Sequence, residues 1–233
     1  MAKTSRAEIV AVARDLMRDK GYAGASMQDI ASAVGLLKGS LYSHFPNKEA
    51  FVPEVLALAF SDTFGVVTPT GDWRKDYELA LGRMVDMLTV NKRCIGLHLV
   101  YGIDESASVL REAVETFFEN IQALLSTLLE QGIDKELAAR LSVDTITELE
   151  GATLWLMLGK AEPMQQAKRR LQARADGYTQ DRPDAHVQRV LEQTVGDWRQ
   201  ASVIERSLAE RVALAEADAL NVRAALEGAS CFR

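Results

Sequence analysis

Histidine and cysteine are scarce in this chain, and their scarcity limits its chemistry. The three histidines (His44, His98 and His186) lie far apart, and the two cysteines (Cys94 and Cys231) form no CxxC or Cys/His group. Structural zinc sites need clustered ligands, and disulfide scaffolds need a higher density of cysteine. The sequence therefore predicts no bound metal and no cofactor. It also shows no nucleophile and base pair of the kind that indicates an enzyme.

Long apolar runs and a one-sided charge are also missing. No run approaches the roughly 18 residues that a membrane-spanning helix needs, and residues 1–10 lack the apolar stretch of a secretory signal. We therefore expect a cytoplasmic protein without a membrane partner. The net charge of −6 gives no overall positive excess, so a nucleic-acid partner can be inferred only from local motifs.

Helical periodicity is what the sequence does contain. Apolar residues recur at spacings of three and four along the chain, and strand-like alternation is nearly absent. Two capping boxes, Ser5-x-x-Glu8 and Ser26-x-x-Asp29, mark the starts of two helices near the N-terminus. The sequence therefore predicts an all-α fold.

The stretch GLLKGSLYSHFPNKEAF, residues 35–51, has the pattern of a helix, a tight turn and a second helix. Gly35 ends a helix of two turns, and Leu41 and Phe45, four residues apart, give the next short helix an apolar edge. Its other side carries small and polar residues. This arrangement is typical of a helix-turn-helix, whose second helix enters the major groove of DNA. A generic three-helix bundle has the same spacing and is the alternative.

With its flanks, over residues 4–58, this segment resembles the DNA-binding domain of the TetR (tetracycline-repressor) family of bacterial regulators. The resemblance rests on the stretches KGY, SMQDIA and GLLKGSLYSHFPNKEAF. It implies an N-terminal three-helix helix-turn-helix domain followed by a larger helical ligand-binding and dimerisation domain. The implied function is a transcriptional regulator, a repressor that binds a palindromic operator in double-stranded DNA as a homodimer. A small-molecule effector would release it.

By position, the resemblance assigns DNA contacts to the start of the second helix, to the third helix and to the cap of the fourth. These residues are Ser26, Met27 and Gln28, then Lys38, Gly39, Ser40, Tyr42, Ser43 and His44, and finally Lys48. Lys38 suits a guanine edge or a phosphate, and the sequence leaves both open. The family usually has Ser or Thr where this chain has Leu37, so we expect the third helix to lack a side-chain cap worth about 1 kcal/mol.

Three domains follow from these patterns. They are a helix-turn-helix domain over residues 1–50 with a linking helix over 47–65, a ligand-binding and dimerisation domain over 66–175, and additional helices of unknown role over 176–233. Pro53 is expected to kink the linking helix. In the second domain, helices are expected around residues 77–88, from 91, from about 104 to 131, and from 134 towards 159.

Seven residues of the second domain combine apolar bulk with a few polar tips, so they are candidates to line a ligand pocket, although each also suits an ordinary core. They are Met84, Leu88, His98, Tyr101, Phe118, Trp155 and Met157.

Cys94 follows two cations near the start of a helix, which favours a thiolate, while a buried and inert thiol is the alternative. Two further functions therefore stay open. One is a cysteine-based repressor that senses electrophiles or redox changes, and the other is a ligand-binding or scaffold protein with a non-functional reader domain.

Overall fold

The computed structural model describes residues 4–102 and 107–178 of the chain. Over these residues it contains nine α-helices, one short 3-10 helix and no strand, which confirms the predicted all-α fold. The chain divides into two compact units, Met1–Ala175 and Asp176–Arg233. Nearly all described residues belong to the first unit. The additional helices predicted within 176–233 lie outside the described residues from 179 onward.

The N-terminal helices begin where the capping residues predict. In the first box, Glu8 N–H donates to Ser5 Oγ (3.2 Å) and Ser5 N–H donates to Glu8 Oε2 (2.7 Å). The second box, between Ser26 and Asp29, has the same two bonds. Because Gly21 has a φ of 75°, the first helix bends there and continues for one further turn. The elements are α1 (Arg6–Gly24), α2 (Met27–Ala33), α3 (Lys38–His44), the 3-10 helix η1 (Glu49–Phe51) and α4 (Val52–Phe64).

An apolar core holds these short helices together. Leu41 and Phe45, the predicted inward edge of α3, are both fully buried, and the Phe45 ring stacks on Phe51 with 3.8 Å between centroids. Helices α1 and α2 add further fully buried side chains to this core, which include Ile9, Ala13, Met17 and Ile30. This packing fixes α3 by one side and leaves its other side free.

The predicted kink at Pro53 is wrong. The chain makes a turn of 3-10 helix at Glu49–Phe51 before α4 begins, and Asn47 Oδ1 accepts a bond from Ala50 N–H (2.9 Å) at its start. Pro53 therefore falls in the first turn of α4. A proline is suited to that position, because a first-turn N–H has no partner within the helix.

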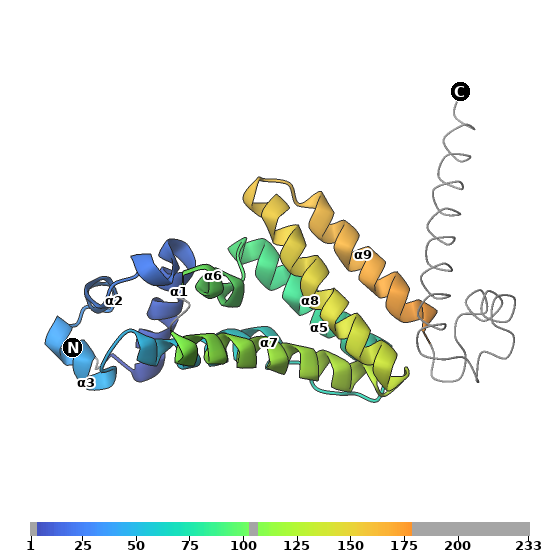
Figure 1. Ribbon diagram of the computed structural model, residues 1–233, viewed down its shortest axis with the longest axis horizontal. Coiled ribbons are helices and arrows are strands. Elements are labelled where there is room, and N and C mark those ends of the chain that lie inside the picture. The colour runs from blue at the N-terminus through green and yellow to red at the C-terminus, as the bar shows by residue number, and fades with distance from the viewer. Residues whose placement is uncertain (1–3, 103–106, 179–233) are drawn as a thin grey trace, which may run out of the picture. The chain divides into compact units, whose positions relative to one another are not determined.

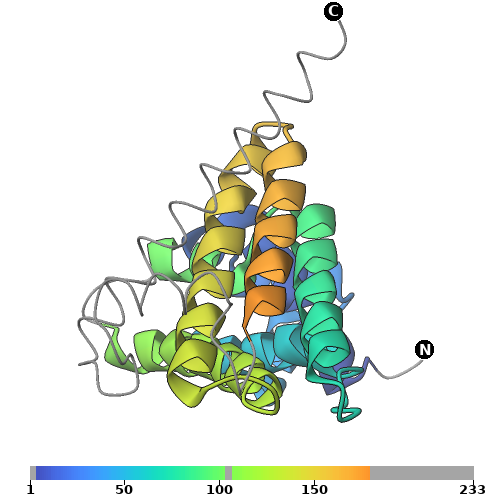
Figure 2. The ribbon, with the colours of Figure 1, turned by 90° about the vertical axis from the view of Figure 1, so that its right-hand side faces the viewer.

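The remaining helices form the larger part of the first unit. They are α5 (Trp73–Asn91), α6 (Ile95–Gly102), α7 (Ser108–Leu129), α8 (Lys135–Met157) and α9 (Glu162–Gly177). Helices α5, α8 and α9 lie side by side, and α7 runs across one end of this layer (Figures 1 and 2). The short helix expected from residue 91 begins at Ile95 instead, because α5 continues to Asn91 and Lys92 then turns with a φ of 56°. None of the described helices is both long and apolar enough to cross a membrane.

Two buried polar side chains in this part, Tyr77 and Asp76, have specific partners. Tyr77 Oη and Thr145 Oγ1 lie 2.7 Å apart and join α5 to α8. The Asp76 carboxylate accepts bonds from the N–H (2.8 Å) and the hydroxyl (2.7 Å) of Thr70, which fixes the turn before α5. A buried polar group left without a partner would cost free energy, so these pairs define how the helices meet.

Gly132, between α7 and α8, provides a test of this packing. A Cβ atom there would overlap the indole of Trp73, whereas a Cβ at Gly82, inside α5, would meet only Lys168 Nζ at 3.9 Å. We expect Gly132→Ala to lower the free energy of unfolding by about 1–3 kcal/mol through overpacking. Gly82→Ala should raise it by about 0.5–1 kcal/mol through helix propensity. Urea denaturation measures both, and equal effects would contradict the close approach at Gly132.

Candidate nucleic-acid interface

The outward side of α3 is an exposed face of small and polar residues. Lys38, Gly39, Ser40, Tyr42 and Ser43 are all exposed, at the end of the unit that carries α2 and α3 (Figure 1). A Cβ added at Gly39 would meet no atom within 4 Å, so the backbone itself is open to an approaching partner. This is the shape that a helix needs to enter a groove about 12 Å wide.

Several predicted contact residues already have partners within the protein. Ser43 Oγ donates to Ser40 O (2.6 Å), and Ser26 Oγ donates to Asp29 Oδ2 (2.7 Å). Gln28 is exposed and donates to Ser32 Oγ (3.2 Å), one turn along α2. The hydroxyls of Ser26 and Ser43 therefore form hydrogen bonds within α2 and α3. To contact DNA, each hydroxyl would have to share its hydrogen bond with the DNA or break it.

Met27 is the first residue of α2. Its side chain is buried, because the first residue of α2 lies on the inner side of that helix, so it offers no side-chain contact to DNA. A DNA contact at Met27 would therefore have to come from its backbone, and the assignment remains a prediction.

Lys48 is held against the end of α1. Its Nζ donates to Tyr22 O (2.8 Å) and lies 4.2 Å from the centre of the Tyr22 ring, and Tyr22 Oη donates to Glu49 Oε1 (3.0 Å). Burial, together with that carboxylate, raises the pKa of Tyr22, so its phenol stays a donor. The predicted phosphate contact of Lys48 remains a prediction. The structure adds an internal role, which is to fix η1 on α1.

Arg6 is a residue that no sequence pattern indicated. Its guanidinium donates to His44 O (2.6 Å), the last carbonyl of α3, and to both Glu54 carboxylate oxygens (2.5 and 3.0 Å). It also lies 4.0 Å from the centre of the Phe45 ring. Glu54 raises the pKa of Arg6 through this hydrogen bond. Arg6 therefore ties the end of α3 to α1 and α4, and holds half-buried His44 by its backbone.

Leu37 precedes α3 as its N-cap. As expected, it makes no side-chain cap bond, and its side chain is 80% exposed. The first N–H groups of α3 are therefore left open to solvent or to an acceptor.

Comparison with known proteins identifies this arrangement. The family model described as "Bacterial regulatory proteins, tetR family" matches residues 9–55. The repressor KstR2 of Rhodococcus jostii is 30% identical over 155 residues, which cover 60% of this chain and 75% of that protein. The chain belongs to the TetR family. As a member, it is a DNA-binding regulator of transcription.

Other relatives agree with the membership. The repressor DhaR of Mycobacterium sp. (strain GP1) is 39% identical over 71 residues, 30% of this chain and 36% of that protein. A TetR regulator from Chloroflexus aurantiacus has 25% identity and a TM-score of 0.65, covering 75% of this chain and 95% of that one. Reduced NemR of Escherichia coli shares the fold at 20% identity and a TM-score of 0.57, over 71% of this chain and 94% of that one.

The seven predicted ligand residues do not gather around one described pocket. Met84 and Leu88 are buried in the core, whereas Tyr101, Trp155 and Met157 are exposed. His98 and Phe118 are intermediate in exposure. Burial, with Arg93 nearby, lowers the pKa of His98, whose Nε2 lies 3.5 Å from a Cβ built on Gly21 at the bend of α1. The assignment of these residues to a ligand remains a prediction.

A groove of about 540 Å³ between α4 and α7 is a stronger candidate for a ligand. That volume lies within the usual range for small-molecule sites. The α4 side is apolar, and the lining residues include Pro53, Leu56, Ala57, Phe60, Ala113 and Phe117. No sequence pattern indicated this groove, because it forms only where two helices distant in sequence cross.

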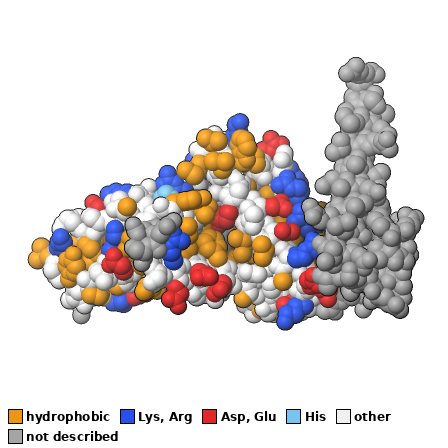
Figure 3. Space-filling model, viewed as in Figure 1, with side chains coloured by type: hydrophobic (Ala, Val, Ile, Leu, Met, Phe, Trp, Pro, Cys, Tyr) orange, Lys and Arg blue, Asp and Glu red, His pale blue; other side chains and the backbone are white. Residues whose placement is uncertain are grey.

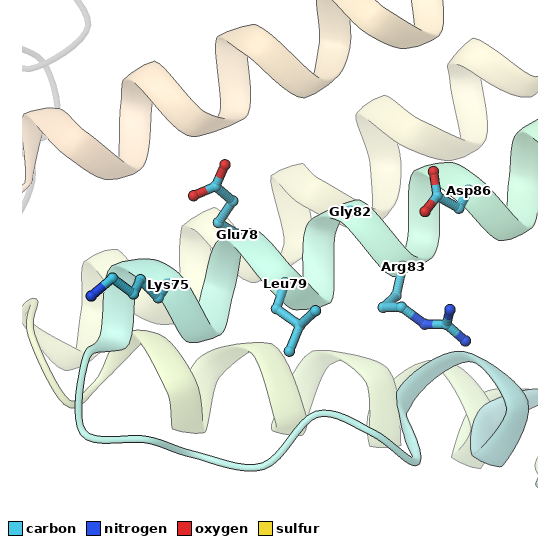
Figure 4. Close-up of a pocket in the computed structure, with 6 residues that line it drawn as sticks. All are labelled: Lys75, Glu78, Leu79, Gly82, Arg83 and Asp86. Atoms are coloured by element: carbon cyan, nitrogen blue, oxygen red, sulfur yellow. The ribbon is translucent and has the colours of Figure 1, made fainter.

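A second hollow, on α5, has a different character. Its six lining residues are Lys75, Glu78, Leu79, Gly82, Arg83 and Asp86 (Figure 4). They come from one helix, and Glu78 points to the side opposite Leu79 and Arg83 (Figure 4). Side chains that diverge in this way do not enclose a small molecule. Within the described ranges, no group of three or more His, Cys, Asp or Glu side chains is arranged to hold a metal ion.

Cys94 immediately precedes α6, and its surroundings support the buried alternative. The side chain is 4% exposed, and burial raises the pKa of the Cys94 thiol well above its ordinary value, as does the carboxyl of Glu150 beside it. A protonated thiol is a weak nucleophile. Among the described residues, Glu150 Oε2 is buried without a hydrogen-bond partner, and burial raises the pKa of Glu150 to about 7.

Glu150 gives a pH-dependent prediction. Its folded pKa lies above the unfolded value of about 4.3, so the carboxyl is protonated in the fold between these two values and must ionise as pH rises through 7. Glu150→Gln should therefore raise the free energy of unfolding, relative to wild type, by about 3 kcal/mol at pH 8.5 and by little at pH 4.5. Urea denaturation at the two pH values measures the difference. A difference that does not change with pH would contradict the shifted carboxyl.

Proposed function

We propose that this TetR-family protein is a homodimeric repressor that binds a palindromic operator and is released by a small-molecule effector. One observation carries the proposal, which is the exposed face of α3 opposite fully buried Leu41 and Phe45. In a helix-turn-helix, a helix presented in this way reads the major groove. Repression rather than activation is supported by the relatives KstR2 and DhaR, which are named as repressors.

The chemistry of the α3 face suits this role. Lys38 has its Nζ 6.0 Å from the Tyr42 ring and no closer partner among the described contacts, so its charge is available to a phosphate or a guanine edge. The Tyr42 hydroxyl suits a phosphate. The exposed backbone at Gly39 allows close approach of the helix to the base edges.

A stripe along α8 supports the homodimer. Val143, Thr147, Gly151, Leu154 and Leu158 are all exposed at spacings of three and four, so they lie on one side of the helix and none is charged. Figure 3 shows hydrophobic side chains gathered where α8 turns into α9. A Cβ at Gly151 would meet nothing within 4 Å, so another helix could approach closely. We propose that a second copy of the chain covers this stripe by twofold symmetry.

The proposed effector would act through α4. Pro53 lines the groove between α4 and α7, and the next residue, Glu54, holds Arg6, which in turn holds the end of α3. A ligand wedged between α4 and α7 would therefore bear on the element that positions the recognition helix. Release requires that the ligand bind better to a conformation in which the two α3 helices no longer fit successive grooves.

Lys38→Ala tests the DNA contact. Duplexes are first selected from a random pool with the full-length protein, and affinity is then measured at several salt concentrations. If Lys38 contacts a phosphate, the variant should bind all selected duplexes more weakly, with a salt slope reduced by about 1. If it contacts a guanine, it should lose about 1–3 kcal/mol at one base pair.

Lys135→Ala is the matched control, since it removes the same charge from an exposed site at the start of α8. It should leave the affinity and the salt slope unchanged. Equal affinity of Lys38→Ala and wild type would remove Lys38 from the interface. A protein that enriches no duplex would favour the ligand-binding or scaffold alternative.

Leu154→Glu tests the dimer. The side chain is 58% exposed, so the substitution should not disturb the fold, but it would place charges against each other across a twofold contact. Sedimentation equilibrium should show a dimer for wild type and a monomer for the variant, with loss of operator binding. Val90→Glu, at an 80% exposed site on α5, should remain a dimer. A monomeric wild type, or a dimeric Leu154→Glu, would show that the stripe is not the interface.

A further inference from the structure

We propose that Leu37 reads thymine in the operator, through apolar contact between its side chain and the 5-methyl group of the base. The inference rests on the proposed function, because it requires α3 to lie in the major groove. Leu37 would then help to determine which sequence is bound. At this position the TetR resemblance leads us to expect the capping hydroxyl of a Ser or Thr.

The geometry places an apolar group at the leading end of the recognition helix. Leu37 has extended backbone angles (φ −67°, ψ 145°), and its carbonyl accepts bonds from Ser40 N–H (2.9 Å) and Leu41 N–H (3.1 Å). The start of the helix therefore fixes the backbone of Leu37, while 80% of its surface stays exposed. In a helix-turn-helix, the N-terminal residues of the recognition helix are the ones that contact base edges.

Leucine contributes little to the folded chain at this position. It makes no cap bond, whereas Ser, Thr, Asp or Asn would satisfy one of the open N–H groups of α3. Its side chain also covers little of the core, which is closed beneath α3 by Leu41 and Phe45. Local stability therefore does not account for a leucine here, and a partner that buries it would.

The chemistry of the groove restricts what that partner can be. Every base pair offers hydrogen-bond donors or acceptors on its major-groove edge, but the thymine methyl is the one apolar group among them. Leu37 can bond to none of the polar groups. The neighbouring Lys38 and Ser40 are the residues suited to polar edges, so Leu37 adds a preference that they do not supply.

The test uses thymine and deoxyuracil, which pair alike and differ by the methyl group. Duplexes are selected with the full-length protein, and each thymine of the enriched site is replaced in turn by deoxyuracil. At one position per half-site, this replacement should lower the affinity of wild type about fourfold. That loss corresponds to the free energy of burying one methyl group. Leu37→Ala should bind the thymine and deoxyuracil duplexes equally at that position.

Two further variants make the test specific. Leu37→Ser restores a capping hydroxyl without an apolar group, so it should fold as wild type and be equally indifferent to the methyl group. Val90→Ala removes an equally exposed apolar side chain from α5 and should keep the fourfold preference.

The outcomes distinguish a failure of the proposed function from a failure of the role proposed for Leu37. If no duplex is enriched, the proposed function fails and this inference fails with it. If a duplex is enriched but wild type is indifferent to every replacement, as it would be if Leu37 touched only deoxyribose, the role of Leu37 alone is wrong. The same holds if Leu37→Ala keeps the wild-type sensitivity at every position.

Discussion

The exposed face of α3 depends on one constraint, which is the burial of Leu41 and Phe45 on the opposite side of the helix. Helix α3 has only seven residues, and a helix of that length is not stable in water by itself. It exists because these two side chains, four residues apart, enter a core in which Phe45 stacks on Phe51. Since the inward pair fixes the rotation of the helix, it also determines which residues face outward, including Lys38.

The helix-turn-helix region, α1 to α3, is joined to the helices that follow it near both ends of α1. Near its start, Arg6 connects the end of α3 to Glu54 of α4. Near its far end, Arg93 Nη1 donates to Arg18 O (3.1 Å) and Asp19 O (2.9 Å), so the turn between α5 and α6 holds the backbone of α1. Hydrogen bonds therefore link α4 to the end of α3, and the turn between α5 and α6 to α1.

The buried group around Cys94 bears on the alternative of a cysteine sensor. The thiol is buried, the Oε2 atom of the neighbouring Glu150 carboxyl is buried too, and burial makes each group favour its protonated form. Nearby cations in the sequence suggested a thiolate, but the desolvation of a buried charge outweighs their attraction. The environment therefore favours a structural thiol over a reactive one.

The sequence by itself determined what depends on neighbours along the chain: the all-α class, both capping boxes, the inward pair on α3, the missing cap at Leu37 and the family. The caps and the inward pair follow from residues within one or two helical turns, and the fold class and the family follow from such local patterns repeated along the chain. The tertiary structure alone decided what depends on distant neighbours. It buried Met27, turned Lys48 onto Tyr22, paired Arg6 with a carboxylate 48 residues away and formed the groove between α4 and α7. Burial and charge pairing depend on residues that are distant in sequence and come together only when the chain folds. No local sequence pattern could therefore specify them.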